Sequence, residues 1–151
     1  MNRTIRWMTP IFAVFCFSVS AAAQDPVGMI KISKGQVGVQ RGDARIAGHA
    51  GLNLYQADRV QTGAGSAVGI SMKDGSLLSA GPNSSLSLDK FSFDVRTDAG
   101  RMSVGVSRGT LSVVTGRIAR QSPESVDFHT PLSILGVRGT AFVIEVVDGG
   151  E

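Results

Sequence analysis

The sequence predicts an all-β protein: a single domain of short strands, arranged as stacked β-arcs, a β-roll or a solenoid, after a cleavable signal peptide. All 19 glycines lie after residue 23, where glycine is about twice as frequent as the ~7% of an average protein. Short runs in this part alternate apolar with small or polar residues, as strands with one buried face do. No segment keeps the spacing and the caps of an amphipathic helix.

The alternation is clearest at residues 37–39, 68–72, 86–88, 102–106 and 111–113, where we expect strands. Residues 73–76 (Lys-Asp-Gly-Ser) are a hairpin-turn signal, because glycine adopts a positive φ without steric cost. Residues 81–84 (Gly-Pro-Asn-Ser) predict a second turn.

The amino-terminal stretch predicts export. Arg3 and Arg6 form a basic region, residues 10–19 are apolar, and the alanines at 21–23 fit a cleavage site that leaves Gln24 as the first residue. The apolar stretch is shorter than the ~20 residues of a membrane span, although an uncleaved anchor is the alternative. We expect a periplasmic or otherwise exported protein without a membrane span after cleavage.

The composition after cleavage excludes several classes of function. Removal of residues 1–23 leaves 128 residues with 13 Lys+Arg against 12 Asp+Glu, and no Lys/Arg run is longer than two residues. A broad electrostatic surface for nucleic acid is therefore not supported. Cys16 leaves with the signal peptide, so we expect neither a disulfide nor a thiol-ligated metal in an oxidising compartment.

The most specific pattern comprises a strand at 126–129, a break at Thr130-Pro131, an apolar run at 132–135, a step at 136–140 and a β-prone run at 141–147. Proline cannot donate to a sheet ladder and favours an extended predecessor, so Pro131 interrupts the first strand. Gly136 and Gly139 bracket two residues of the step, which predicts a bulge or a close backbone approach inside a strand.

This segment resembles the closing block of the FecR domain, which has an aromatic strand, Thr-Pro, and Val-Arg-Gly-Thr before a Phe-containing strand. Other blocks of that family are matched in order by residues 35–39, 51–54, 57–67, 74–76 and 109–111. The resemblance covers roughly residues 30–147. With the signal peptide at 1–23, we expect a short segment at 24–29, a FecR-like β-domain at 30–147 and a C-terminal turn at 148–151. The family pattern normally continues through a further strand, so either the chain is truncated before that strand or another chain completes the edge of residues 141–147.

The best-known members of that family regulate iron uptake through a cytoplasmic anti-sigma segment, one membrane helix and this β-domain in the periplasm. Only about ten residues precede the apolar stretch here, so only the β-domain is carried over. The resemblance implies a non-catalytic sensory or scaffold module that contacts an unidentified envelope protein. A glycan-associated or other structural protein of the cell envelope is the alternative. The candidate contact or structural residues are Asp58, Thr62, Thr130, Pro131, Arg138, Gly139 and Thr140.

A weak internal repeat accompanies these motifs. A charged residue, a glycine, a small or polar residue and an apolar residue recur around Gly42, Gly75, Gly109 and Gly139, with glycines 33, 34 and 30 residues apart. A steady period predicts stacked β-arcs, each burying its face against the next. In a chain so rich in glycine, coincidence is the alternative interpretation.

No residue pattern indicates catalysis, a cofactor or a metal. His49 and His129 are the only histidines. Asp127, His129 and a serine have the residue types of a hydrolytic triad, but a triad is defined by its geometry, which the sequence does not give. Two isolated histidines and scattered acids lack zinc or calcium spacing. We expect His129 to pack or to form a hydrogen bond at a strand end.

Arg138 has two possible roles in this pattern. Strict alternation would place it on one face with Thr140 and Phe142. There it would fix the bulge, through an internal ion pair with Asp58 or Asp74 or by clamping carbonyl groups, or it would contact a ligand or partner. The run at 141–147 is followed only by a turn signal. An edge strand with unpaired backbone groups favours docking or self-association, so we expect one of the two there.

Overall fold

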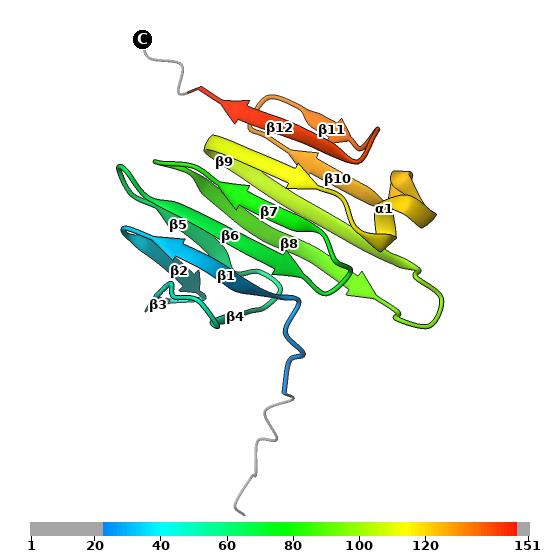
Figure 1. The fold of residues 1–151 in the computed structure, drawn as a ribbon, viewed down its shortest axis with the longest axis horizontal. Helices are drawn as coiled ribbons and strands as arrows, with labels where there is room; N and C mark the ends of the chain where they lie inside the picture. Colours follow the sequence, from blue (N-terminus) through cyan, green and yellow to red (C-terminus); the bar gives the residue numbers. More distant parts are fainter. Residues whose placement is uncertain (1–22, 148–151) are drawn as a thin grey trace, which may run out of the picture.

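The computed structural model describes residues 23–147, and strands make up 55% of the structure, which confirms the all-β prediction (Figure 1). The elements in order are β1 (Gly28–Lys34), β2 (Val37–Arg41), β3 (Ala44–Ala47), β4 (Asn53–Leu54), β5 (Arg59–Thr62), β6 (Ala67–Met72), β7 (Leu77–Ala80), β8 (Ser85–Phe93), β9 (Gly100–Val114), α1 (Arg117–Gln121), a 3-10 turn (Pro123–Ser125), β10 (Val126–His129), β11 (Ile134–Gly136) and β12 (Ala141–Val146).

One sheet curls into a roll with two layers. Its strand order is β3-β2-β5-β8-β9-β7-β6-β1-β4, and all of these neighbours are antiparallel. The long strand β9 serves both layers, because its first part pairs with β8 and its last part pairs with β7. β12 extends the layer of β1, β6 and β7, whereas β10 lies parallel to the first part of β9 and β11 follows it.

The core lies between the two layers and is built from alternate residues of each strand. In β6, for example, Val68, Ile70 and Met72 are buried while the residues between them are partly exposed. The fully buried large side chains are Phe128, Ile30, Leu54, Ile70, Leu78, Leu86, Leu88, Met102, Leu111, Ile118, Val39 and Val60. The predicted alternation is thus the pattern by which each strand faces the other layer.

The predicted turn at 73–76 joins β6 to β7 and also fixes the start of α1. The buried carboxylate of Asp74 accepts hydrogen bonds from the Ser76 N–H (3.0 Å) and hydroxyl (2.8 Å). The Gly116 N–H donates to Ser76 Oγ at 2.9 Å, and the Arg117 N–H donates to the Asp74 carbonyl at 2.9 Å. Asp74 is therefore a structural joint and not a counter-ion of Arg138, so that expectation was wrong.

The glycines of the weak repeat share a backbone conformation. Gly42, Gly75, Gly109 and Gly139 all have positive φ, between +57° and +101°. Because neighbouring strands along the sheet path are antiparallel, the repeated motif marks turns and kinks within a roll. Of the arrangements that the sequence left open, the β-roll describes the structure best.

Two local features differ from the sequence-based expectations. The helix α1 was not predicted, because its five residues are too few to establish a helical period. Residues 137–140 do not form a bulge inside a strand; they carry the chain from β11 in one layer to β12 in the other. Gly139 has φ +101° and Val137 is buried while Arg138 is exposed, so strict alternation from Arg138 to Phe142 does not hold.

The segment between β3 and β4 closes the roll at the N-terminal end. The Gly48 N–H donates to the Val37 carbonyl in β2 at 2.8 Å, and the Ser33 hydroxyl of β1 donates to the Gly48 carbonyl at 2.9 Å. The Ile30 N–H of β1 donates to the Leu52 carbonyl at 2.9 Å. This segment therefore ties the two layers together through main-chain groups.

Two predicted segments fall largely or wholly outside the described residues: the signal peptide at 1–23, of which only residue 23 is described, and the C-terminal turn at 148–151. Within residues 23–147, no helix is both long enough and apolar enough to cross a membrane.

Candidate functional site

The seven residues chosen from the motifs separate into two groups. Asp58 and Thr62 are buried in the body of the roll. Thr130, Pro131 and the three residues of Arg138-Gly139-Thr140 lie at the other end of the domain, beside β11 and β12. Only the second group is accessible enough to contact a partner.

Asp58 holds the tip of the β2–β3 hairpin against the loop before β5. Arg41 Nε donates to Oδ1 at 2.9 Å and Arg41 Nη2 donates to Oδ2 at 2.7 Å, a bidentate pair. The Tyr55 N–H also donates to Oδ2, and the Arg41 guanidinium lies 4.4 Å from the centre of the Tyr55 ring. The hydrogen bonds to Asp58 raise the pKa of Arg41 above its ordinary value. Asp58 is thus paired with Arg41 and not with Arg138, which corrects the prediction.

Thr62 has a structural role in a buried polar network between turns. Its hydroxyl donates to the Gly81 carbonyl at 2.6 Å and accepts from the Ser84 N–H at 2.9 Å. The Ser84 hydroxyl in turn accepts from the Thr110 N–H at 3.0 Å. This network joins the end of β5, the β7–β8 turn and β9.

The C-terminal edge, which we define as β11, β12 and the turn 130–133, leaves two strand edges unpaired within the described residues. β11 pairs with β10 on one side, and β12 pairs with β9 on one side. β11 and β12 lie in different layers and are not paired with each other. Unpaired edges present free N–H and C=O groups and are the usual template for strand addition.

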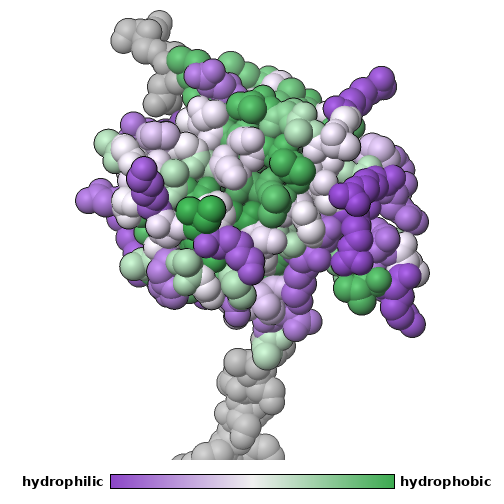
Figure 2. All heavy atoms as spheres, in the orientation of Figure 1, coloured by the Kyte–Doolittle hydropathy of each residue, from purple (hydrophilic) through white to green (hydrophobic). Residues whose placement is uncertain are grey.

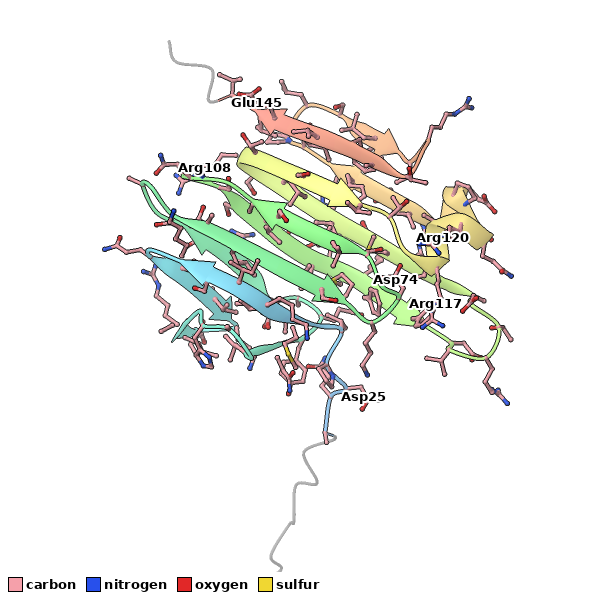
Figure 3. The ribbon with its side chains drawn as sticks, in the orientation of Figure 1. Asp25, Asp74, Arg108, Arg117, Arg120 and Glu145 are labelled. Atoms are coloured by element: carbon pink, nitrogen blue, oxygen red, sulfur yellow. The ribbon has the colours of Figure 1, made fainter. Side chains whose placement is uncertain are left out.

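Large apolar side chains are exposed along this edge. The exposed fraction is 95% for Leu132, 78% for Ile134, 65% for Val143 and 76% for Val147. Figure 2 shows hydrophobic residues gathered over the part of the surface formed by β7, β9 and β12, with hydrophilic residues around them. Figure 3 shows Glu145 on β12, and Glu145 is the one charged residue of this strand. The patch in Figure 2 lies on the face of β7, β9 and β12, where Leu77, Val114 and Val143 are exposed, and it includes β12 of the C-terminal edge. Exposed apolar patches mark interaction sites.

Two hollows open between β11 and β12. The first has a volume of about 980 Å³, with Leu135, Val137, Phe142 and Ile144 in its wall. The second, of about 750 Å³, shares Leu135 and Ile144 with the first and also borders Leu132. Both are open grooves lined mainly by apolar side chains, so they are suited to side chains of an added segment.

The motif residues of this end shape the rim of the hollows. Thr130 and Pro131 border the second hollow, and the Ser133 N–H donates to Thr130 Oγ1 at 3.1 Å, which forms the turn that projects Leu132 outward. Arg138 and Gly139 border the first hollow. The Thr140 carbonyl accepts from the Thr115 N–H at 2.9 Å, which anchors the start of β12.

A separate polar cluster surrounds His129 at the end of β10. His129 Nε2 lies 2.8 Å from Asp89 Oδ2, and its Nδ1 lies 3.8 Å from Asp127 Oδ2. The Ser103 hydroxyl donates to Asp127 at 2.7 Å and the Ser87 hydroxyl donates to Asp89 at 3.1 Å. His129 therefore forms a contact at a strand end, as predicted.

This cluster does not have the geometry of a hydrolytic triad. In a triad the serine hydroxyl is hydrogen-bonded to the imidazole, whereas Ser103 and Ser87 each donate to a carboxylate here. Across residues 23–147, no group of three or more His, Cys, Asp or Glu side chains is arranged to hold a metal ion.

Sequence reasoning missed that the apolar run at 132–135 is exposed. A short apolar run has the same appearance whether it lies in the core or at an open edge. Residues 134–136 (Ile-Leu-Gly) of β11 are all exposed and none is charged, so the sequence itself held no signal of this exposure.

Comparison with known proteins gives one match. A model of the FecR protein family matches residues 58–151, which is more than half of the chain. No curated protein and no solved structure matches the chain.

Proposed function

The chain belongs to the FecR protein family, and on that basis we propose that it is a sensory or scaffold module of the cell envelope that binds another envelope protein through its C-terminal edge. It is exported by the signal peptide at 1–23 and acts in the periplasm. Its role is to bind and not to catalyse a reaction.

The observation that carries this proposal is the coincidence of free strand edges and exposed apolar residues. The core of the roll is formed by other, buried residues, whereas Leu132, Ile134 and Val143 are exposed to water. An extended segment of the partner could pair with the free edge of β11 while its side chains enter the second hollow beside Leu132. The matched motif residues Thr130, Pro131, Arg138 and Gly139 line that region.

A protein partner fits this surface better than a glycan. Sugar binding generally uses the open face of an aromatic ring. The Tyr55 ring is covered by Arg41 and the Phe93 ring by Arg117, 4.4 and 4.7 Å from the ring centres. Among the described residues, Phe142 is the one aromatic side chain that borders either hollow, and it packs edge to face at 5.3 Å against the fully buried Phe128.

The non-catalytic role is supported by the cluster around His129. Asp89 occupies the Nε2 side of the imidazole, and both neighbouring serines are held by carboxylates. No base is therefore hydrogen-bonded to a serine nucleophile in this cluster.

The test is crosslinking in the cell from a defined position. A photoreactive amino acid replaces Ile134, which is 78% exposed at the C-terminal edge, and in a matched control it replaces Ile32, which is 65% exposed on β1. We expect a specific envelope protein, identified by mass spectrometry, to be recovered from position 134 and not from position 32. Equal recovery from both positions, or recovery of peptidoglycan alone, would contradict the proposal.

A further inference from the structure

Among residues 23–147, β12 pairs on one side only, so a defined set of its backbone groups is unpaired on the other side. Opposite residues of an antiparallel pair alternate between exchanging both backbone hydrogen bonds and exchanging none. The Thr140 carbonyl accepts from the Thr115 N–H at 2.9 Å, so Thr140 and every second residue after it face β9. It follows from the register that Ala141, Val143 and Glu145 direct their N–H and C=O groups away from β9.

The outward backbone groups of these three residues can pair with the same three residues of a second copy in an antiparallel arrangement. A two-fold axis at Val143 places Val143 opposite Val143 of a second copy, and Ala141 opposite Glu145. In that register every outward N–H and C=O of Ala141, Val143 and Glu145 finds an acceptor or donor on the other copy. A shift of two residues in either direction leaves one of the three outside the paired strand.

The side chains also match in this register. On the outer face, Glu145 is opposite an alanine, and it is the only charged residue in β12, so like charges do not face each other. On the inner face, Phe142 is opposite Ile144 of the other copy, and both residues line the first hollow. The pairing therefore covers apolar side chains and continues the core from one copy to the next.

We infer that β12 pairs antiparallel with β12 of a second copy of this chain, with Val143 at the two-fold axis. This inference rests on the proposed function, because it names the strand that completes β12 at the same edge. Leu132, in the turn 130–133, and Ile134, in β11, remain available to contact the envelope partner. The assembly is isologous and closed, so it stops at two copies.

The first test introduces a charge at the two-fold axis. Val143 is 65% exposed, so V143K and V143E should fold. Each variant places like charges opposite each other at about 5.5 Å between Cα atoms, and we expect each to weaken dimerisation about tenfold in sedimentation experiments. An equimolar mixture should restore the dimer as a Lys–Glu heterodimer. A monomeric wild type, or a dimer that neither variant weakens, would overturn the inference.

The second test is a disulfide at the axis. Residues 24–151 contain no native cysteine, so V143C in this mature chain should form an intermolecular disulfide on oxidation, because the Cα separation suits that bond. The control is V95C, since Val95 is 67% exposed in the β8–β9 loop. Crosslinking from both positions to the same extent would contradict the assigned axis.

The two proposals fail in different ways. If the dimer is absent while Ile134 still crosslinks to an envelope protein, the self-pairing is wrong and the proposed function stands. If the dimer forms while position 134 recovers no envelope protein, the pairing is right and the proposed function fails.

Discussion

The two ends of the roll differ in whether the chain itself covers the edges of their strands. At the N-terminal end, the segment between β3 and β4 crosses from one layer to the other and bonds to β1 and β2 through Ile30, Ser33, Val37 and Gly48. At the C-terminal end, residues 137–140 also cross between the layers, but the edges of β11 and β12 beyond them stay unpaired in the described part of the chain. One end is closed by its own main chain, and the other keeps two unpaired strand edges among residues 23–147.

The side chains follow the same division. The last strand at the closed end, β4, contributes the fully buried Leu54, and the edge strand β3 is short and carries Arg45, a charge that discourages strand addition. At the open end, β11 carries no charge and β12 carries only Glu145. β3 and β12 therefore carry one charge each, and the two ends differ in β11, which has no charge, and in the buried Leu54 of β4.

The largest expected effect comes from comparing one leucine at each end. Leu54→Ala removes a fully buried side chain and should lower the free energy of unfolding by about 3 kcal/mol, the typical cost of such a cavity. Leu132→Ala, at a site 95% exposed, should leave it unchanged. Urea denaturation of both variants measures the difference. Similar losses would mean that Leu132 is covered within the monomer and that the end is closed.

The second largest effect is expected at the ion pair between Arg41 and Asp58, near the N-terminal end of the roll. Asp58→Ala removes the acceptor of two Arg41 hydrogen bonds and of the Tyr55 N–H, and it should cost about 2–4 kcal/mol because these groups lose a partner at a buried site. Asp43→Ala, at an exposed position in the same hairpin, is the control and should not change stability. Equal stability of the two variants would show that the carboxylate does not fix the hairpin.

A substitution in β11 should have the smallest effect on stability. It should instead weaken binding of the envelope partner. Ile134→Lys places a charge on the exposed edge and should reduce recovery of the envelope partner while the unfolding midpoint stays constant. Ile32→Lys is the matched control on β1. Pull-down from envelope extracts and thermal denaturation measure the two properties. A large fall in the melting temperature of the Ile134 variant would place that side chain in the core.

The predictable parts of the fold depend on local sequence. The turn at 73–76 is encoded by Asp74 and Gly75 themselves, and the strands by their alternation. The pairing of Arg41 with Asp58, and of His129 with Asp89, joins residues that are far apart in the chain. Such contacts depend on how the sheet curls, and a single sequence does not specify that.

The candidate site was only half predictable for the same reason. The motif residues at 130–131 and 138–140 lie at the end of the domain that has the exposed apolar side chains, and the run at 141–147 indicated an edge strand. The exposure of Leu132 and Ile134 depends on whether another segment covers them, and composition does not encode that.

The most direct test of the difference between the two ends is residue-resolved amide hydrogen exchange, at a concentration where the protein is monomeric. The Ile30 N–H is bonded to the Leu52 carbonyl, so it should exchange slowly. The N–H groups of Val143 and Glu145 face the free edge and should exchange nearly as fast as in an unfolded chain. Slow exchange of Val143 at every dilution would contradict the open edge, because the chain would then cover β12 by itself.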